Sequence, residues 1–503
     1  MPLLLESLPQ FQRGQHNDSE TQALVWTEVS VPHMSGYDAV VVGAGPNGLT
    51  AAARLGVAGL RVLVVEASAT VGGGSRTQSL GLHARYDVCA AVHPFGASSP
   101  AFEALRLHEH GLTWRYPPIG LAHPFDDGTA ATVHRSTSAA PRLTADSLGI
   151  DGDQWQRIVG PFAADWNRWR HLVLGAILPT TLHHPLAMAH LAAVAGMPST
   201  ALARTFRARE AKALIVGMAA HSGSSLRQFA TGGIAIALAA ASEAAGMPVA
   251  GGGSQSIIDA LVDVVVTNGG TIETNHLIYK RSQLPPAEAL LFDTTPGQAA
   301  AILGVRAPRW RHGVAAWKLD LVLSAPMPWI SAACHDAGTI HLGGTWQEIV
   351  AAEGATASGR LDPLPFVIVA QPSVADVSRT APGEHVLWAY RHVPNGCTAD
   401  AATSGIEAQF DRFAPGWRAL VLHRKVTTAI DYSRYNPSYV GGDVAGGALS
   451  VRQTIARPRL AMDPYRTRVR GAWLCSQSTP PGPGVHGMPG WHAAGSVLAA
   501  LQR

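Results

Sequence analysis

The sequence is poor in charge and in cysteine. Charged side chains make up 15% of its 503 residues, and 38 Lys and Arg stand against 35 Asp and Glu. Such a near balance gives no gathered basic surface, so we expect no nucleic-acid partner. The four cysteines lie far apart without a C-x-x-C pair. This spacing argues against a disulfide framework, a cysteine zinc site and dithiol chemistry, and we expect no metal.

The sequence also lacks the marks of a secretory signal and of a membrane span. The N-terminus has no basic region followed by an apolar core and a cleavage site. No apolar run reaches the ~18 to 20 residues that a span needs. The nearest run, residues 171–197, is broken by prolines and histidines and predicts a buried helical pair. We therefore expect a cytoplasmic protein, with peripheral membrane contact as the alternative. The oligomeric state is not readable from these patterns.

The first informative motif comes directly after a short β-branched run. Residues 39–42 predict a strand buried on both faces, and residues 49–60 predict a helix of small residues. Between them, Gly43, Gly45 and Gly48 have the spacing G-x-G-x-x-G. Gly43 permits a tight turn, Gly45 lets a pyrophosphate approach the backbone, and Gly48 lets the helix pack closely on the strand. The amides at the start of the helix would then face phosphate charge.

The segment after this helix favours FAD over NAD(P). A second predicted strand, residues 61–67, contains Glu66 near its end, where a carboxylate accepts hydrogen bonds from ribose hydroxyls and repels a 2′-phosphate. A second glycine turn then begins at Gly72, where an NAD domain would continue with further strand and helix units. Arg76 ends this turn, and a guanidinium is well suited to bind a diphosphate. This order predicts the longer cofactor.

Several segments resemble the phytoene desaturase-like branch of the FAD-dependent amine oxidase superfamily, and most specifically its pyridine nucleotide-disulphide oxidoreductase domain 2 group. They are residues 40–53 (VVVGAGPNGLTAAA), 65–77 (VEASATVGGGSRT), 249–275, 436–447 (NPSYVGGDVAGG) and 473–495. Within the third, residues 256–266 predict an amphipathic helix and residues 271–275 a strand.

The resemblance implies an α/β fold, with a Rossmann-type FAD-binding domain of the glutathione reductase and amine oxidase kind and an inserted α+β substrate domain. Residues 1–36 would form an N-terminal extension. The FAD-binding domain would consist of residues 37–115, 246–310 and 431–503. The substrate domain would consist of residues 116–245, which are mainly helical, and residues 311–430.

The C-terminal segment repeats the G-x-G-x-x-G spacing at Gly482, Gly484 and Gly487. Only sixteen residues come after it, too few for a second nucleotide fold. Residues 471–477 predict a buried strand and residues 488–501 a helix. In the relatives this helix begins at the pyrimidine edge of the isoalloxazine, where its partial positive charge would stabilise a reduced ring. The resemblance therefore implies that both glycine motifs hold one cofactor.

The predicted cofactor-binding residues lie in the two glycine turns, after the strand at 271–275 and in the C-terminal segment. They are Gly43, Gly45, Pro46, Asn47, Gly48, Glu66, Ala67, Gly73, Gly74, Ser75, Arg76, Ile278, Ser476, Gln477, Gly487, Met488 and Pro489. Many relatives have an acidic residue after the last strand, where this chain has Cys475 to Gln477. Neutral hydrogen bonding would replace the carboxylate there.

The predicted reaction is hydride removal from a C–H bond of a largely apolar or amine-bearing small molecule. The chain has no second strand, loop, helix and acid unit for NAD(P)H, so oxygen, a quinone or another acceptor would reoxidise the reduced FAD. Candidate catalytic residues are Lys318, His221, His486 and Trp491. Two alternatives remain open: a flavin-dependent isomerase of the carotenoid isomerase type, and a non-enzymatic escort or carrier protein on the same fold.

Overall fold

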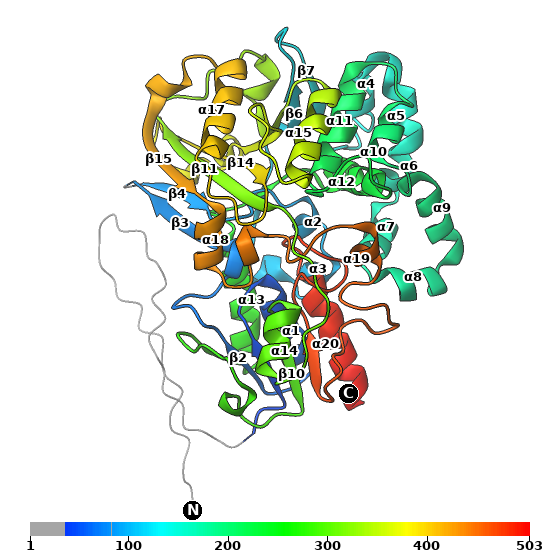
Figure 1. Cartoon of the computed structure of the whole chain (residues 1–503), viewed down its shortest axis with the longest axis vertical. Helices are drawn as coiled ribbons and strands as arrows, with labels where there is room; N and C mark the ends of the chain where they lie inside the picture. Colours follow the sequence, from blue (N-terminus) through cyan, green and yellow to red (C-terminus); the bar gives the residue numbers. More distant parts are fainter. Residues whose placement is uncertain (1–35, 82, 503) are drawn as a thin grey trace, which may run out of the picture. The chain divides into compact units, whose positions relative to one another are not determined.

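The computed structural model describes residues 36–81 and 83–502. The chain divides into two units, residues 1–36 and residues 37–503. Apart from Gly36, the predicted N-terminal extension lies outside the described residues. Two large β-sheets organise the second unit, and Figure 1 shows each sheet with the helices that cover it.

The first sheet is parallel and has five strands in the order β16-β10-β1-β2-β9. Its strands are β1 (Ala39–Val42), β2 (Val62–Val65), β9 (Thr271–Glu273), β10 (Ala289–Phe292) and β16 (Ala472–Leu474). The central strands are buried along their whole length, as expected for Val- and Leu-rich strands covered on both faces. The sheet thus joins segments from both ends and the centre of the chain.

Three helices cover one face of this sheet: α1 (Pro46–Val57), α13 (Gln255–Thr267) and α20 (Met488–Leu501). The shorter α14 (Pro296–Ile302) lies on the other face. Helix α1 contacts both α13 and α20. The approach of α20 is so close that a Cβ added to Gly490 would lie 1.8 Å from the carbonyl oxygen of Asn47. The end of the chain is thereby fixed beside the first glycine loop.

The second sheet has seven strands in the order β15-β11-β14-β13-β12-β6-β7, and its only parallel pair among the described residues is β12 with β6. Its strands are β6 (Ile119–Pro124), β7 (Ala130–Val133), β11 (Ala315–Leu323), β12 (Ala337–Leu342), β13 (Val367–Ala370), β14 (His385–Val393) and β15 (Val421–Thr427). Segments 116–245 and 311–430 therefore meet in one sheet.

Helix α17 (Ala401–Phe413) packs on one face of the second sheet. Helices α11 (Arg209–Ala220), α12 (Thr231–Ala245) and α15 (Trp346–Ala357) contribute to the core on the other face. Short strands β3 (Thr77–Leu80) and β4 (Ala84–Asp87) form a hairpin, and β5 (Trp114–Arg115) pairs with β8 (Val249–Ala250). The shorter helices are α2 (Pro94–Ala97), α3 (Pro100–Ala104), α4 (Leu143–Ser147), α5 (Gly152–Ile158), α6 (Gly160–Ala164), α7 (Trp166–Val173), α10 (Ser199–Ala203), α16 (Pro372–Ala375), α18 (Ala429–Tyr435) and α19 (Val451–Ile455).

The predicted elements around the motifs are confirmed, with shifted ends. The predicted strand at 39–42 and the predicted helix at 488–501 have the expected bounds. The helix expected at 49–60 begins earlier, at Pro46, because proline is favoured in the first turn, and it ends at Val57. The strand expected at 471–477 ends at Leu474, and the next residues turn toward the C-terminal loop.

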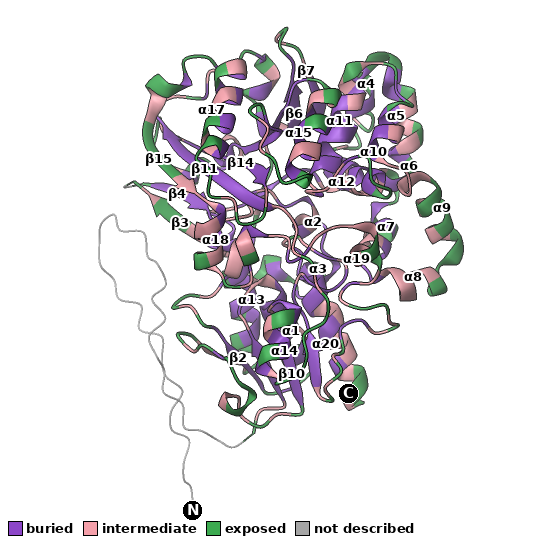
Figure 2. Ribbon diagram, in the orientation of Figure 1, coloured by how far each residue is buried: buried purple, intermediate pink, exposed green. Residues whose placement is uncertain are grey.

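The burial predicted for residues 171–197 is wrong, although two helices form there. They are α8 (Ile177–His183) and α9 (Pro185–Ala195), and none of their residues is buried. Leu182 and Leu186 are 62% and 86% exposed, and Figure 2 shows no buried colour on either helix. One side of α9 still contacts the core, where Ala187, Met188, Leu191 and Val194 are partly buried. Among the described residues, no helix is long and apolar enough to cross a membrane.

Candidate functional site

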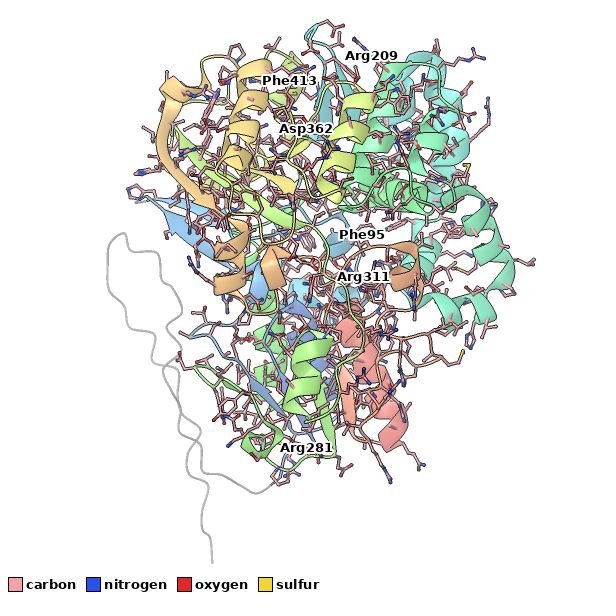
Figure 3. The ribbon with its side chains drawn as sticks, viewed as in Figure 1. Phe95, Arg209, Arg281, Arg311, Asp362 and Phe413 are labelled. Atoms are coloured by element: carbon pink, nitrogen blue, oxygen red, sulfur yellow. The ribbon has the colours of Figure 1, made fainter. Side chains whose placement is uncertain are left out.

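A cavity of about 830 Å³ is lined by residues of both sheets. The loops after β1, β2 and β10 line one part of it, and strand β14 with helix α12 lines another. Phe95, which Figure 3 labels, also lines the cavity and packs against the core of each sheet. The volume is within the range of small-molecule and cofactor sites.

The first glycine loop closes tightly against Asp293, which lies directly after β10. A Cβ added to Gly45 would lie 2.6 Å from Asp293 Oδ2, and one added to Gly48 would lie 2.1 Å from the carbonyl oxygen of Gly43. Gly43 has a φ of +103°, which disfavours any other residue. Gly43 and Gly45 line the cavity, whereas Gly48 does not. The role of Gly48 is therefore close packing of α1 against β1, as the motif predicts.

Asp293 is a site residue that the sequence did not reveal. Its Oδ2 accepts a hydrogen bond of 3.0 Å from the amide of Gly48, so this amide does not point to an open phosphate site. Burial, with a smaller contribution from the charge of Glu66, raises the Asp293 pKa to about 7. Its position directly after a buried run, LLF, was the available signal, because parallel strands end at the same edge of a sheet.

Glu66 is held at the end of β2 by two backbone amides. Its Oε2 accepts from Ala44 N at 2.8 Å, and its Oε1 accepts from Ser68 N at 2.9 Å. Ala67 lines the cavity beside it, as does Ile278 in the segment after β9. The carboxylate is thus fixed at the edge of the cavity where the sequence places a ribose.

The two glycine turns pack against each other. The amide of Gly72 donates to the carbonyl of Ala44 at 2.8 Å, and a Cβ on Gly73 would lie 3.2 Å from Cα of Gly45. A Cβ on Gly74 would lie 2.1 Å from the hydroxyl of Tyr439. Segments far apart in the sequence therefore meet here with no room for side chains, and their backbone faces the cavity.

The guanidinium of Arg76 is hydrogen-bonded to backbone carbonyls of the second glycine turn. Its Nε donates to the carbonyl of Val71 at 3.2 Å, its Nη1 donates to Gly73 at 3.3 Å and to the Tyr435 hydroxyl at 3.0 Å, and its Nη2 donates to Thr70. Each guanidinium nitrogen therefore has a protein partner. Arg76 lines the cavity, and its contact with a diphosphate stays a prediction.

The cavity around these turns fits a dinucleotide. Ser75 Oγ and Asn47 Oδ1 are buried atoms of cavity-lining residues, and neither has a hydrogen-bond partner within the described part of the chain. Buried polar atoms in proteins are normally paired, so both would gain from a polar partner. A hydroxyl beside glycine backbone suits a phosphate oxygen, and Glu66 suits ribose hydroxyls. Pro46 completes this part of the lining.

The C-terminal segment lines the cavity through only some of the predicted residues. Ser476 and Gln477 are on the lining, as expected, together with residues 484–486. The predicted Gly487, Met488 and Pro489 are not. Gly487 instead has a φ of +67°, and a Cβ there would lie 2.3 Å from the Thr50 hydroxyl. The first turn of α20 is packed against α1, so the loop before it reaches the cavity.

Two of the four catalytic candidates do not line the cavity. Lys318 is fully buried, and its Nζ lies 2.6 Å from the carbonyl oxygen of Asp87 and 2.8 Å from Asp320 Oδ1. Burial lowers the pKa of this lysine. Trp491 packs outside the cavity, with the guanidinium of Arg54 4.0 Å from the centre of its ring. These contacts hold both side chains in place, and a catalytic role for either stays a prediction.

His486 and His221, the other two candidates, do line the cavity. His486 Nδ1 accepts from the amide of Met488 at 3.2 Å, and burial lowers the His486 pKa to about 4. His221 Nε2 lies 3.0 Å from Nε2 of His341, and burial lowers the His221 pKa to about 3. Both rings are therefore neutral near pH 7.

Sequence reasoning missed most of the wall that faces the glycine turns. Strand β14 contributes Trp388, Tyr390 and His392, and the loop at 443–449 contributes a glycine-rich edge. Alternate residues of a strand share one face, so the pattern W-x-Y-x-H was readable in the sequence. Nothing in the sequence showed that this face meets the cavity.

Comparisons with known proteins agree with this fold. Residues 41–106 match the family model of the NAD(P)-binding Rossmann-like domain. A mouse pyridine nucleotide-disulfide oxidoreductase domain-containing protein 2 is 24% identical over 93% of this chain and 94% of its own. A solved oxidoreductase from Methanosarcina mazei has a TM-score of 0.58 and 15% identity, over 92% of this chain and 99% of that chain. A putrescine oxidase triple mutant has a TM-score of 0.58 and 17% identity, over 92% and 99%. The predicted α/β fold with a Rossmann-type domain is confirmed.

Proposed function

Because the motifs and the comparisons support the pyridine nucleotide-disulphide oxidoreductase domain 2-like branch of the FAD-dependent amine oxidase superfamily, we propose that this chain is an FAD-dependent oxidoreductase. It removes a hydride from a C–H bond of a largely apolar small molecule. The observation that carries this proposal is a single cavity that extends from the two glycine turns to the wall formed by β14.

In the nucleotide part of this cavity, Glu66 would bind the ribose and the backbone at Gly45 and Gly73 would face the diphosphate, with Ser75 Oγ free to donate to it. The bound FAD supplies hydride acceptance. The chain's own contribution is to orient the cofactor, to exclude water and to keep His486 neutral beside it. Glu66 so close to the ribose also disfavours a 2′-phosphate.

The substrate part of the cavity is mainly apolar. Its lining includes Val173, Leu174, Ile234, Ala237, Leu238 and Ile368. Such a lining favours a substrate with apolar groups, because removal of apolar surface from water contributes ~25 cal/mol per Å² to the free energy of binding. An apolar or amine-bearing substrate, and oxygen or a quinone as electron acceptor, remain our proposals from the sequence.

Anaerobic mixing of the purified holoprotein with candidate substrates tests the proposed reaction. An oxidised substrate with loss of the visible flavin absorbance, restored by oxygen or by a soluble quinone, is the expected result. Substrate rearrangement without net oxidation, and only after the flavin has been reduced beforehand, would replace this proposal with the isomerase. A protein that retains ligands but neither binds nor reduces flavin would replace it with a carrier.

We also propose that helices α8 and α9 contact a phospholipid surface. Leu182 and Leu186 are exposed apolar side chains of these helices, and α8 begins three residues after the cavity-lining Leu174. Neutral phospholipid vesicles should retain the native protein in a sedimentation assay. The double variant Leu182→Glu and Leu186→Glu should lose this retention, whereas Val377→Glu, at another exposed apolar residue, should not. Equal retention of all three proteins would contradict the contact.

A further inference from the structure

Strand β14 presents an aromatic row to the substrate part of the cavity. Trp388, Tyr390 and His392 are alternate residues, so they share one face of the sheet, and all three line the cavity. The rings of Trp388 and Tyr390 are 5.0 Å apart, and those of Tyr390 and His392 are 5.5 Å apart. The row ends at His392 in a group that can form hydrogen bonds.

A buried carboxylate orients the ring of His392. Glu353, from α15, is 3% exposed, and its Oε2 lies 2.9 Å from His392 Nδ1. Nδ1 is thereby paired with the carboxylate, and Nε2 is the ring nitrogen left for a ligand. Nε2 lies beside the turn after α11, since a Cβ added to Gly223 would be 3.7 Å away. His392 therefore offers this ring nitrogen near the turn that also holds His221.

The His221 ring is hydrogen-bonded to a second imidazole, that of His341. The Nε2 atoms of His221 and His341 are 3.0 Å apart, so one proton lies between two neutral rings. Burial lowers the pKa of both histidines, and His341 is fully buried. This pairing fixes the orientation of the His221 ring at the cavity. His341 thus acts through His221 as a positioning residue.

Two cavity-lining residues, Thr339 and Trp388, each have a polar atom that has no hydrogen-bond partner in the described part of the chain. Thr339 Oγ1 and Trp388 Nε1 are buried and have no hydrogen-bond partner among residues 36–81 and 83–502, and both residues line the cavity. Thr339 lies in register with Ala370, and Ala370 with Trp388, so the two polar residues occupy one row across the sheet. Buried polar atoms are normally paired, so this row points to a polar group of the ligand.

The carboxylate hydrogen-bonded to His392 is that of Glu353, 2.9 Å from Nδ1. The carboxylates among the described cavity-lining residues are Glu66, Asp293 and Asp443. Each accepts from the backbone: Glu66 from two amides, Asp293 from Gly48 N, and Asp443 from Gly313 N at 2.8 Å and Ala445 N at 3.0 Å. Within the described residues their hydrogen-bond partners do not include His221 or His392, so binding of a cationic probe is compared with binding of a neutral one.

We propose that the substrate carries a hydroxyl group, which donates its hydrogen bond to His392 Nε2 and lies beside His221. This inference rests on the proposed function, because it concerns the substrate part of the same cavity. His392 and His221 are the binding residues, while Glu353 and His341 hold them in the required orientation. The apolar wall holds the rest of the molecule.

Calorimetric binding of three small probes to the native protein tests this assignment. 1-Hexanol donates and accepts a hydrogen bond, its isomer 1-methoxypentane only accepts, and hexylammonium is a cation. We expect hexanol to bind about fivefold more tightly than the ether, the ratio that corresponds to one net hydrogen bond of ~1 kcal/mol. In His392→Leu this ratio should fall to about one. His385→Leu, a histidine of β14 that does not line the cavity, should keep it.

Glu353→Gln gives a second test, in case His392→Leu does not fold. An amide can accept from Nδ1–H through its oxygen or donate to Nδ1 through its nitrogen, so it no longer fixes the ring, and the preference for hexanol over the ether should shrink. Equal binding of alcohol and ether by the wild-type protein would overturn the proposal. Tighter binding of hexylammonium would overturn it in favour of a cationic substrate.

These outcomes are separable from failure of the proposed function. Flavin content and flavin reduction are measured on the same preparations, without reference to the probes. A protein that prefers hexanol but holds no flavin would keep this site and contradict the oxidoreductase. A flavoprotein that oxidises substrates without any preference for a hydroxyl would support the oxidoreductase and contradict the hydroxyl site.

Discussion

The nucleotide part and the substrate part of the cavity are built in opposite ways. Around the glycine turns, the chain packs backbone against backbone, and a single Cβ on Gly48 or Gly74 would meet an atom about 2 Å away. Around β14, residues of α12, of the turn after α11 and of strands β11, β12 and β13 surround open space. The first part has little freedom to vary without loss of the cofactor. The second can change its ligand by changes of side chain.

The largest expected effect is on the nucleotide part alone. In Gly48→Ala the added methyl would lie 2.1 Å from the carbonyl oxygen of Gly43. We expect FAD content to fall below about a tenth of wild type, a loss of more than ~1.4 kcal/mol in cofactor binding. Gly354→Ala is the matched control, because its Cβ would meet nothing within 4 Å in helix α15. The measurement is the flavin released per chain. Equal FAD contents in the two variants would contradict the close packing that we assign to the nucleotide part.

The next effect should fall on the substrate part alone. Ala237 lines the cavity from α12, so Ala237→Trp fills space that a substrate would occupy. We expect 1-hexanol to bind about tenfold more weakly, since overpacking typically costs ~1 to 3 kcal/mol. The FAD content should stay at the wild-type value. Loss of flavin together with the probe would show that the two parts are not independent.

A smaller effect is expected at the ribose position. Glu66→Gln keeps the shape of the side chain but removes the charge that accepts from two amides. We expect the dissociation constant for FAD to rise about fivefold, as for the loss of ~1 kcal/mol. Glu273→Gln, at the end of the neighbouring strand β9, is the control and should bind FAD as wild type does. Titration of the flavin-depleted proteins with FAD provides the measurement.

The smallest effect concerns acid stability. Burial lowers the pKa of His123 to about 4, so the native protein binds fewer protons than the unfolded chain between pH 6.5 and 4. The free energy of unfolding must therefore fall as the pH drops through this range. His123→Gln should reduce the slope by less than about 1.4 kcal/mol per pH unit. The exposed His108→Gln should leave it unchanged, and an equal slope in all three proteins would contradict the assignment.

The contrast between the nucleotide part and the substrate part of the cavity also explains what could be predicted from the sequence. The strand, glycine loop, helix and Glu66 are contiguous, and the contact of Gly48 with the carbonyl of Gly43 lies within this short stretch, so the glycine loop was predictable. Asp293 was not, because it approaches Gly45 only through the pairing of β10 with β1. Tertiary packing brought it there.

The contacts among the histidines of the substrate part could not be predicted from the sequence, for the same reason. His221, His341, Glu353 and His392 come from four elements, and none has a local spacing that signals its partner. With 22 histidines in the chain, composition could not select among them. Lys318 and Trp491 show the converse, since each occurs within a suggestive motif and yet is not part of the cavity lining.

The most direct test of the central claim is the identity and amount of nucleotide released from the purified protein by heat. If one cofactor occupies the cavity between the glycine turns and residues 484–486, wild-type protein should release one FAD per chain, and Gly48→Ala should release almost none. A colourless wild-type protein that releases no flavin, and takes none up when FAD is added, would contradict it.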